Sequence, residues 1–419
     1  MASQKFPQSG HGSQAIMDAL LAAKANDVDW RSGRLNSLVH FANNDVLDIS
    51  KAASNAYFSE NALGLAAFPS IKQMMQDLGR WVGDLLQAPE TAGATITTGG
   101  TESIFLAIVA ARERFLKRYR PVPNRPLNIV VPWSAHPAFS KTGFYLGIEV
   151  RRAALAEDFA ADPQAMAALI DEGTIMLAAS APAYPHGVID PVEDIAALAV
   201  TRDLWMHVDA CVGGFTLPFL RDLGHPLPGF DFAIDGVTSM SADLHKYGFT
   251  AKGCSALVVR DQALVKHHRF VFEDWPRGAY QSDGFCGSRP ASPIASAWAV
   301  LQFLGRDGYC DIMRTIIAGR DKYIAAVQSH RDLTVWGQPR ATVFSYGAME
   351  LDIYDIAATM AEVGWNPHLI TQPKGIHLGQ LTPVHAGVAD AYAEDLAAAV
   401  KKVKTGYKPA SRITATYGG

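Results

Sequence analysis

The sequence predicts an α/β protein in which helices cover both faces of a mainly parallel sheet, followed by a smaller C-terminal α+β domain. Two observations carry this prediction. Short runs rich in Val, Ile, Leu and Met alternate with helical patterns along the chain, and several of these runs are apolar at nearly every position. Strands of that composition are covered on both faces, which is the usual state of parallel strands between helices.

The expected elements follow one another along the chain. A helical pattern covers residues 13–25, and the stretch from there to Ala62 is polar, rich in Asn and left unassigned. After Phe68-Pro69-Ser70, apolar residues recur every three or four positions up to Leu86, which predicts an amphipathic helix. Strands are expected at 129–131, 175–179, 205–208, 238–241 and 255–259.

Beyond Pro293, the pattern changes to a helix, a strand at 342–346 and an Ala-rich helix at 388–403. These elements suffice for a second, smaller domain. We therefore divide the chain into an N-terminal arm with a helix (1–67), a large domain (68–293) and a small C-terminal domain (294–419).

Length and composition exclude several classes of protein. The chain has 419 residues, 49% hydrophobic and 19% charged, as in soluble globular proteins. Its net charge of −4 provides no excess of positive charge for a nucleic-acid backbone. The longest apolar run, residues 104–111, is far shorter than the roughly 20 residues of a membrane span. We expect a cytoplasmic protein with four reduced cysteines, no metal site and no membrane span.

A lysine beside a histidine stands between two expected strands. Lys246 follows His245 in the segment SADLHKYGFTAKG at 241–253. Burial in a cleft lowers the pKa of a lysine, which would supply the free amine that forms a Schiff base. Taken alone, Lys246 is more simply a solvated surface lysine.

Two further segments have the composition of sites for an anion and for a ring nitrogen. In TTGGTES at 97–103, glycines let backbone N–H groups approach a phosphate at a helix N-terminus, where the hydroxyl of Thr101 adds a donor. Asp209 ends an expected strand, where ligands of α/β proteins bind, and would keep a facing pyridine nitrogen protonated. A turn before a helix and a capping Asp are the plainer interpretations of each segment by itself.

The phosphate-binding segment, Asp209 and Lys246 occur in an order that suits pyridoxal 5′-phosphate (PLP). This cofactor needs an anchor for its phosphate, a partner for its ring nitrogen and a Schiff-base lysine. Around them the chain resembles the fold-type I PLP-dependent enzymes, in the branch of the group II amino-acid decarboxylases and above all the sphingosine-1-phosphate lyases. The resemblance implies a seven-stranded sheet and runs from about Phe68 to the C-terminus. It rests on six segments in register: TTGGTES (97–103), SAHPAFSKT (134–142), SAPAYPHG (180–187), HVDACVGGF (207–215), SADLHKYGFTAKGCS (241–255) and GSRPA (287–291).

The resemblance implies a role for each matching residue. Lys246 would form the Schiff base with the cofactor, His136 would stack on its ring and Asp209 would pair with its nitrogen. Tyr184 and Lys252 would face an amine substrate, Tyr184 moving a proton and Lys252 binding a phosphate or carboxylate. Further cofactor contacts are expected from Gly100, Thr101, Ala210 and His245, and, across a homodimer interface, from Gly287 and Ser288 of the other subunit.

One position departs from the lyases. Their segment before the Phe-Pro pair reads close to NPLHPDIFP, whereas this chain has NALGLAAFP at 61–69, so that Gly64 replaces the histidine. This departure concerns the substrate more than the cofactor. The sequence predicts a PLP-dependent carbon–carbon lyase that splits a phosphorylated β-hydroxyamine, such as a sphingoid base phosphate, into an aldehyde and an amine phosphate. The alternatives are an amino-acid decarboxylase on the same scaffold and a non-catalytic binding protein.

Overall fold

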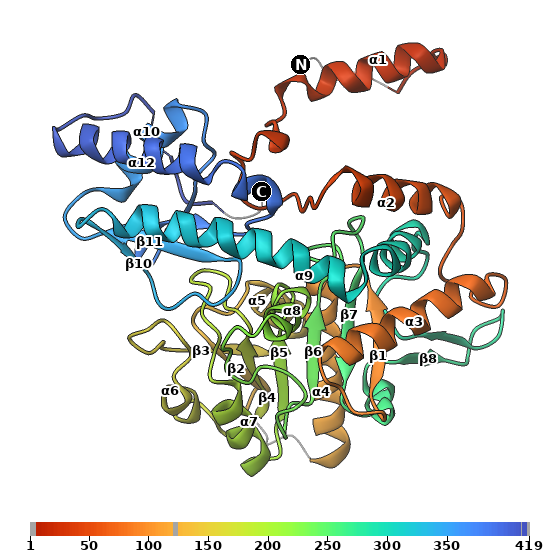
Figure 1. Cartoon of the computed structure of the whole chain (residues 1–419). Coiled ribbons are helices and arrows are strands. Elements are labelled where there is room, and N and C mark those ends of the chain that lie inside the picture. The colour runs from red at the N-terminus through yellow and green to blue at the C-terminus, as the bar shows by residue number, and fades with distance from the viewer. Residues whose placement is uncertain (1–5, 120–124, 412, 417–419) are drawn as a thin grey trace.

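The computed structural model describes residues 6–119, 125–411 and 413–416. A large domain surrounds a seven-stranded sheet, and a smaller C-terminal domain contains a four-stranded antiparallel sheet (Figure 1). Helix α9 (Ser292–Gln328) runs between the two domains and packs against helices of both. The predicted α/β class, with a smaller α+β domain, is confirmed.

The large sheet is mainly parallel, as predicted. Its strands are β1 (Gly93–Thr97), β2 (Asn128–Pro132), β3 (Glu149–Ala153), β4 (Thr174–Ser180), β5 (Trp205–Asp209), β6 (Ser239–Ala242) and β7 (Ser255–Val259). Their order is β1-β7-β6-β5-β4-β2-β3, and only β7 runs antiparallel to its neighbours. The carboxyl ends of the other six strands therefore meet at one edge, where α/β proteins bind ligands.

Alternate residues of the central strands enter two hydrophobic clusters, one on each face of the sheet. Val130 packs in the cluster that includes residues of α3 (Pro69–Leu85) and α7 (Val192–Thr201). Its neighbours Ile129 and Val131 pack in the cluster of α4 (Gly100–Arg118) and α5 (Ala138–Leu146). Because both faces are covered, the strand has no polar side, which explains the continuous apolar runs in the sequence.

The small domain contains the C-terminal elements. Its strands are β10 (Leu333–Val335), β11 (Phe344–Ala348), β12 (His368–Thr371) and β13 (Lys374–Leu378), in the order β10-β11-β13-β12. Its helices are α10 (Ile353–Glu362), α11 (Pro383–Ala386) and α12 (Ala389–Lys404). The strand predicted at 342–346 begins two residues later, and the Ala-rich helix lies where it was expected.

Helix α2 (Asn44–Ala56) occupies part of the stretch that the sequence left unassigned. Asn43 caps it by accepting a hydrogen bond from the N–H of Val46, and the helix packs against α9. Helix α1 (Ser13–Ala23) buries none of its residues and extends away from both domains (Figure 1). The remaining elements in the described part of the chain are short: α6 (Pro163–Ala167), α8 (Leu217–Asp222), β8 (Phe270–Phe272), β9 (Tyr280–Ser282) and four 3₁₀ turns. Among the described helices, none has the length and apolar character that a membrane span requires.

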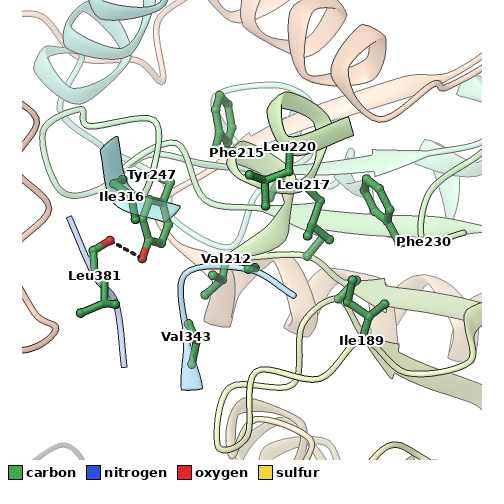
Figure 2. Close-up of a cluster of buried hydrophobic side chains, with 14 of the residues drawn as sticks. Ile189, Val212, Phe215, Leu217, Leu220, Phe230, Tyr247, Ile316, Val343 and Leu381 are labelled. Atoms are coloured by element: carbon green, nitrogen blue, oxygen red, sulfur yellow. Dashed lines mark hydrogen bonds between the residues drawn. The ribbon is translucent and has the colours of Figure 1, made fainter. Parts of the chain in front are cut away.

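A buried cluster joins the two domains near the expected lysine. Val212, which follows β5, packs in the same cluster as Val343 of the small domain (Figure 2). The hydroxyl of Tyr247 donates a hydrogen bond of 2.9 Å to the carbonyl of Leu381, also in the small domain. Because Tyr247 directly follows Lys246, the small domain helps to hold the turn that carries this lysine.

Candidate active site

The turn between β1 and α4 forms an anion cradle. Glu102, in the first turn of α4, accepts hydrogen bonds from the N–H and the hydroxyl of Thr98 at 2.7 and 2.6 Å, which fixes the turn. A Cβ atom at Gly100 would lie 2.5 Å from Sγ of Cys211, so this position requires glycine. Gly100 and Thr101 line a cavity of about 380 Å³ at the N-terminus of α4, where the helix dipole favours an anion.

Asp209 and His136 line the same cavity from the carboxyl ends of β5 and β2, which are separated in the sheet by β4. Asp209 is the last residue of β5, and its carboxylate accepts hydrogen bonds from the N–H of Cys211 and the hydroxyl of Ser241 at 3.1 and 3.3 Å. His136 lies in the turn between β2 and α5, where its Nδ1 accepts a hydrogen bond from the N–H of Ala138. Burial lowers the pKa of His136, which favours a neutral ring in the cavity.

Lys246 lies in the turn after β6 and points to a carboxylate that the sequence interpretation did not single out. Its Nζ is 2.9 Å from Oδ2 of Asp243, whose side chain is only 2% exposed. Burial alone would lower the pKa of Lys246, but the nearby acidic groups, Asp243 foremost and also Asp209, together with the hydrogen bond to Asp243, outweigh burial and raise it. The expectation of a lowered pKa at Lys246 is therefore wrong, because a lysine beside a buried carboxylate keeps its proton.

His245 is oriented by the backbone that follows β6. Its Nδ1 accepts hydrogen bonds from the N–H groups of Gly253 and Cys254 at 3.3 and 3.2 Å. A neutral ring with Nδ1 as acceptor carries its proton on Nε2. His245 lines the cavity with Thr101, so this proton can serve a bound phosphate.

A second cavity, of about 810 Å³, adjoins the first. Four residues line both cavities: His136, Tyr184, His245 and Lys246. Lys252 lines only the larger one, and its Nζ donates hydrogen bonds to the carbonyl of His245 at 2.8 Å and to Nδ1 of His40 at 3.1 Å. Burial and the charge of Lys246 lower the pKa of Lys252 to about 8, so it is a cation at neutral pH. Lys246 thus lies where a cofactor cavity meets a roomier cavity.

Three predicted cofactor residues do not line either cavity. Ala210 is fully buried, and Gly287 and Ser288 lie in the loop before α9. The hydroxyl of Ser288 accepts a hydrogen bond of 3.0 Å from Asn61 of the same chain. Contact of Gly287 and Ser288 with a cofactor in another subunit stays a prediction.

Sequence interpretation missed several polar residues at the cavities, among them Asp243, His40 and Ser37. Asp243 stands three positions before Lys246 in the same segment, but its ion pair with Lys246 depends on the conformation of the turn, which the sequence pattern does not predict. His40 and Ser37 come from the unassigned N-terminal stretch, which carries no pattern that could reveal them. Ser37 Oγ is 3.2 Å from the hydroxyl of Tyr184.

The residues of the smaller cavity fit PLP. The cofactor needs an anion site, a carboxylate for its ring nitrogen, a flat partner for its ring and an amine. The cradle at Gly100 and Thr101, Asp209, His136 and Lys246 offer these groups around one cavity. With the sheet order described above, they define a PLP-dependent enzyme of fold type I.

Comparisons with known proteins agree. The family described as "Pyridoxal-dependent decarboxylase conserved domain" matches residues 30–344. Sphingosine-1-phosphate lyase of Arabidopsis thaliana is 34% identical over 97% of this chain and 75% of its own length. For sphingosine-1-phosphate lyase 1 of Mus musculus these values are 33%, 95% and 70%. The chain therefore belongs to the pyridoxal-dependent decarboxylase family, within its group of sphingosine-1-phosphate lyases.

A solved structure supports the same relationship. The sphingosine-1-phosphate lyase of Burkholderia pseudomallei matches with a TM-score of 0.92 and 32% identity, covering 97% of this chain and 94% of that one. A glutamate decarboxylase of Lactobacillus brevis, 19% identical with a TM-score of 0.83, shares the fold. The predicted family, the PLP cofactor and the class of PLP-dependent lyases are thereby confirmed.

Proposed function

We propose that the protein cleaves a phosphorylated β-hydroxyamine, such as a sphingoid base phosphate, between Cα and Cβ. The larger cavity carries the proposal, because it combines the cation of Lys252 with apolar side chains. Those side chains are Leu38, Trp133, Leu369 and Ile370. A cation beside an apolar wall suits a substrate with an anionic head and an apolar chain. The relatives named sphingosine-1-phosphate lyases support this class of substrate.

Bound PLP supplies an electron sink for the charge that remains on Cα when its bond to Cβ breaks. Lys246 would hold the cofactor covalently, and Asp209 would keep a proton at the pyridine nitrogen. The N–H groups of α4, with Thr101, would bind the phosphate. His136 would keep the ring in one orientation, and that orientation selects the bond of Cα that breaks.

We assign to Tyr184 the proton transfer at the β-hydroxyl. An aldehyde forms only when this hydroxyl loses its proton, so a base is needed where the two cavities meet. The hydroxyl of Tyr184 has Ser37 as a hydrogen-bond partner at 3.2 Å, which supports a fixed direction for the phenol. Lys252 would bind the substrate phosphate as a point charge.

A product assay by mass spectrometry tests the proposal. From a phosphorylated sphingoid base we expect an aldehyde and an amine phosphate without carbon dioxide, and no turnover by Lys246→Ala. Tyr184→Phe should lower kcat by about 10²- to 10⁴-fold while the cofactor absorbance stays unchanged. Stoichiometric carbon dioxide from an amino acid, with no aldehyde from any β-hydroxyamine, would overturn the proposal in favour of a decarboxylase.

We further propose a cytoplasmic homodimer in which Gly287 and Ser288 reach the phosphate site of the other subunit. Exposed aromatic side chains near β8 and β9 support an interface there: Phe270, Phe272, Trp275 and Phe285. Mixing Lys246→Ala chains with Ser288→Trp chains should restore about a quarter of the wild-type activity, because half of the dimers are hybrids with one intact site. Mixed subunits that stay inactive, although they form hybrids, would count against this contribution.

A further inference from the structure

The C-terminal segment, residues 413–416, forms part of the wall of the larger cavity. Ala415 and Thr416 line this cavity together with residues 368–372 of the small domain. Neither residue belongs to the six segments on which the family resemblance rests, and neither has been given a role above. Their place beside the substrate cavity calls for one.

Contacts with α10 direct the chain toward this cavity after α12 ends. The hydroxyl of Tyr407 is 3.0 Å from both carboxylate oxygens of Glu362, and the N–H of Ala410 donates to the same side chain at 3.4 Å. Nζ of Lys408 is 2.6 Å from Oδ2 of Asp355. These contacts anchor the segment just before it meets the cavity wall.

Side-chain exposure alternates along the segment itself. Ile413 is half-buried and packs against the hydrophobic core, Thr414 is exposed and Ala415 is half-buried again. This alternation is typical of an extended segment that rests one face on the molecule. Ala415 therefore presents its methyl group to the cavity, while Thr414 points to solvent.

We propose that Ala415 is a specificity-determining residue, and that the segment at 413–416 limits the length of apolar chain that the enzyme accepts. The inference rests on the proposed function, because it concerns the substrate of the same cavity. Each methylene group buried on an apolar wall strengthens binding about fourfold. A larger side chain at position 415 would take the space of the terminal methylene groups and remove that gain.

Substitution by tryptophan tests the inference, with Thr414→Trp as the matched control on the exposed side. The probes are butyl, hexyl and octyl phosphate, whose binding to the holoenzyme is measured by calorimetry. Loss of two methylene contacts predicts that Ala415→Trp binds octyl phosphate about 15-fold more weakly, while butyl phosphate changes less than about threefold.

Turnover of β-hydroxyamine phosphates of increasing chain length gives a second readout. In Ala415→Trp, KM for the long-chain substrates should rise more than KM for the shortest one. The inference is overturned if Ala415→Trp binds all three alkyl phosphates as Thr414→Trp does. It stands, and the proposed function alone fails, if the length profile shifts while wild-type enzyme releases no aldehyde.

Discussion

Replacing Lys246 with methionine should destabilise the cofactor-free protein by about 3 kcal/mol at neutral pH. Methionine keeps the apolar stem but leaves the carboxylate of Asp243, 2% exposed, without the amine that lies 2.9 Å away. Removing one partner of a buried ion pair costs about 3–5 kcal/mol. We take the lower end, because the side chain of Lys246 is 25% exposed and water screens part of the interaction.

The loss of stability in Lys246→Met should become smaller as the pH falls. Burial raises the pKa of Asp243, but the charges of Lys246 and His245 lower it below its usual value. A lowered pKa in the folded protein contributes stability above the pKa of the unfolded chain, and this contribution disappears in acid. In Lys246→Met, burial prevails and the carboxyl takes up a proton at higher pH. The difference between the two proteins should therefore be largest near about pH 7 and fade toward about pH 4.

Urea unfolding, followed by tryptophan fluorescence, measures this difference. Both proteins are treated with hydroxylamine to remove cofactor and compared at about pH 5 and pH 7.5. Lys141→Met, at an exposed position of α5, is the control, and Lys246→Met with Asp243→Leu should recover part of the loss. If Lys246→Met loses no more stability than the control, or the same amount at both pH values, the reasoning about the ion pair is refuted.

Three further predictions concern the cavity and its surroundings. Because the pKa of Lys252 is lowered to about 8, the affinity of the protein for sulfate, measured by calorimetric titration, should fall as the pH rises through 8. If the affinity of Lys252→Arg falls equally over this pH range, the titration of Lys252 is not the cause. Gly64→His should change the free energy of unfolding in urea by less than about 0.5 kcal/mol, because no atom lies within 4 Å of the added Cβ. A large loss of stability would show that the site is crowded. Tyr247→Phe should cost about 1–3 kcal/mol in urea unfolding, because the buried carbonyl of Leu381 loses its donor, and a neutral effect would mean that water replaces the hydroxyl.

The sequence could predict the central strands because their burial leaves a direct trace in composition. The runs at 129–131, 175–179 and 255–259 lie inside β2, β4 and β7. Strands β1 and β3, both at an edge of the sheet, were missed. Strand β1 is mostly buried, but its sequence Gly93-Ala-Thr-Ile-Thr97 consists of small and polar residues apart from Ile96 and carries no apolar run. Edge position leaves β3 half-exposed, so its sequence Glu149-Val-Arg-Arg-Ala153 carries no apolar run.

The candidate site could be predicted where it consists of segments between regular elements. Thr101, Asp209 and Lys246 stand at strand or helix ends, and the sheet order brings them to one cavity. The substrate side could not be predicted in this way, because its walls come from segments without a chemical pattern. The domain boundaries at 67/68 and 293/294 remain predictions, since α9 begins at Ser292 and serves both domains.

Tyr184 illustrates why the substrate side depends on the whole chain. The N-terminal segment contributes Ser37, whose Oγ is 3.2 Å from the phenol oxygen. The small domain contributes His377, which donates from Nε2 to the carbonyl of Tyr184 at 2.8 Å and packs edge-on against its ring. Each of these hydrogen bonds is worth about 1 kcal/mol. Tyr184 is therefore contacted by both the N-terminal segment and the small domain, so its geometry depends on the assembly of three distant segments.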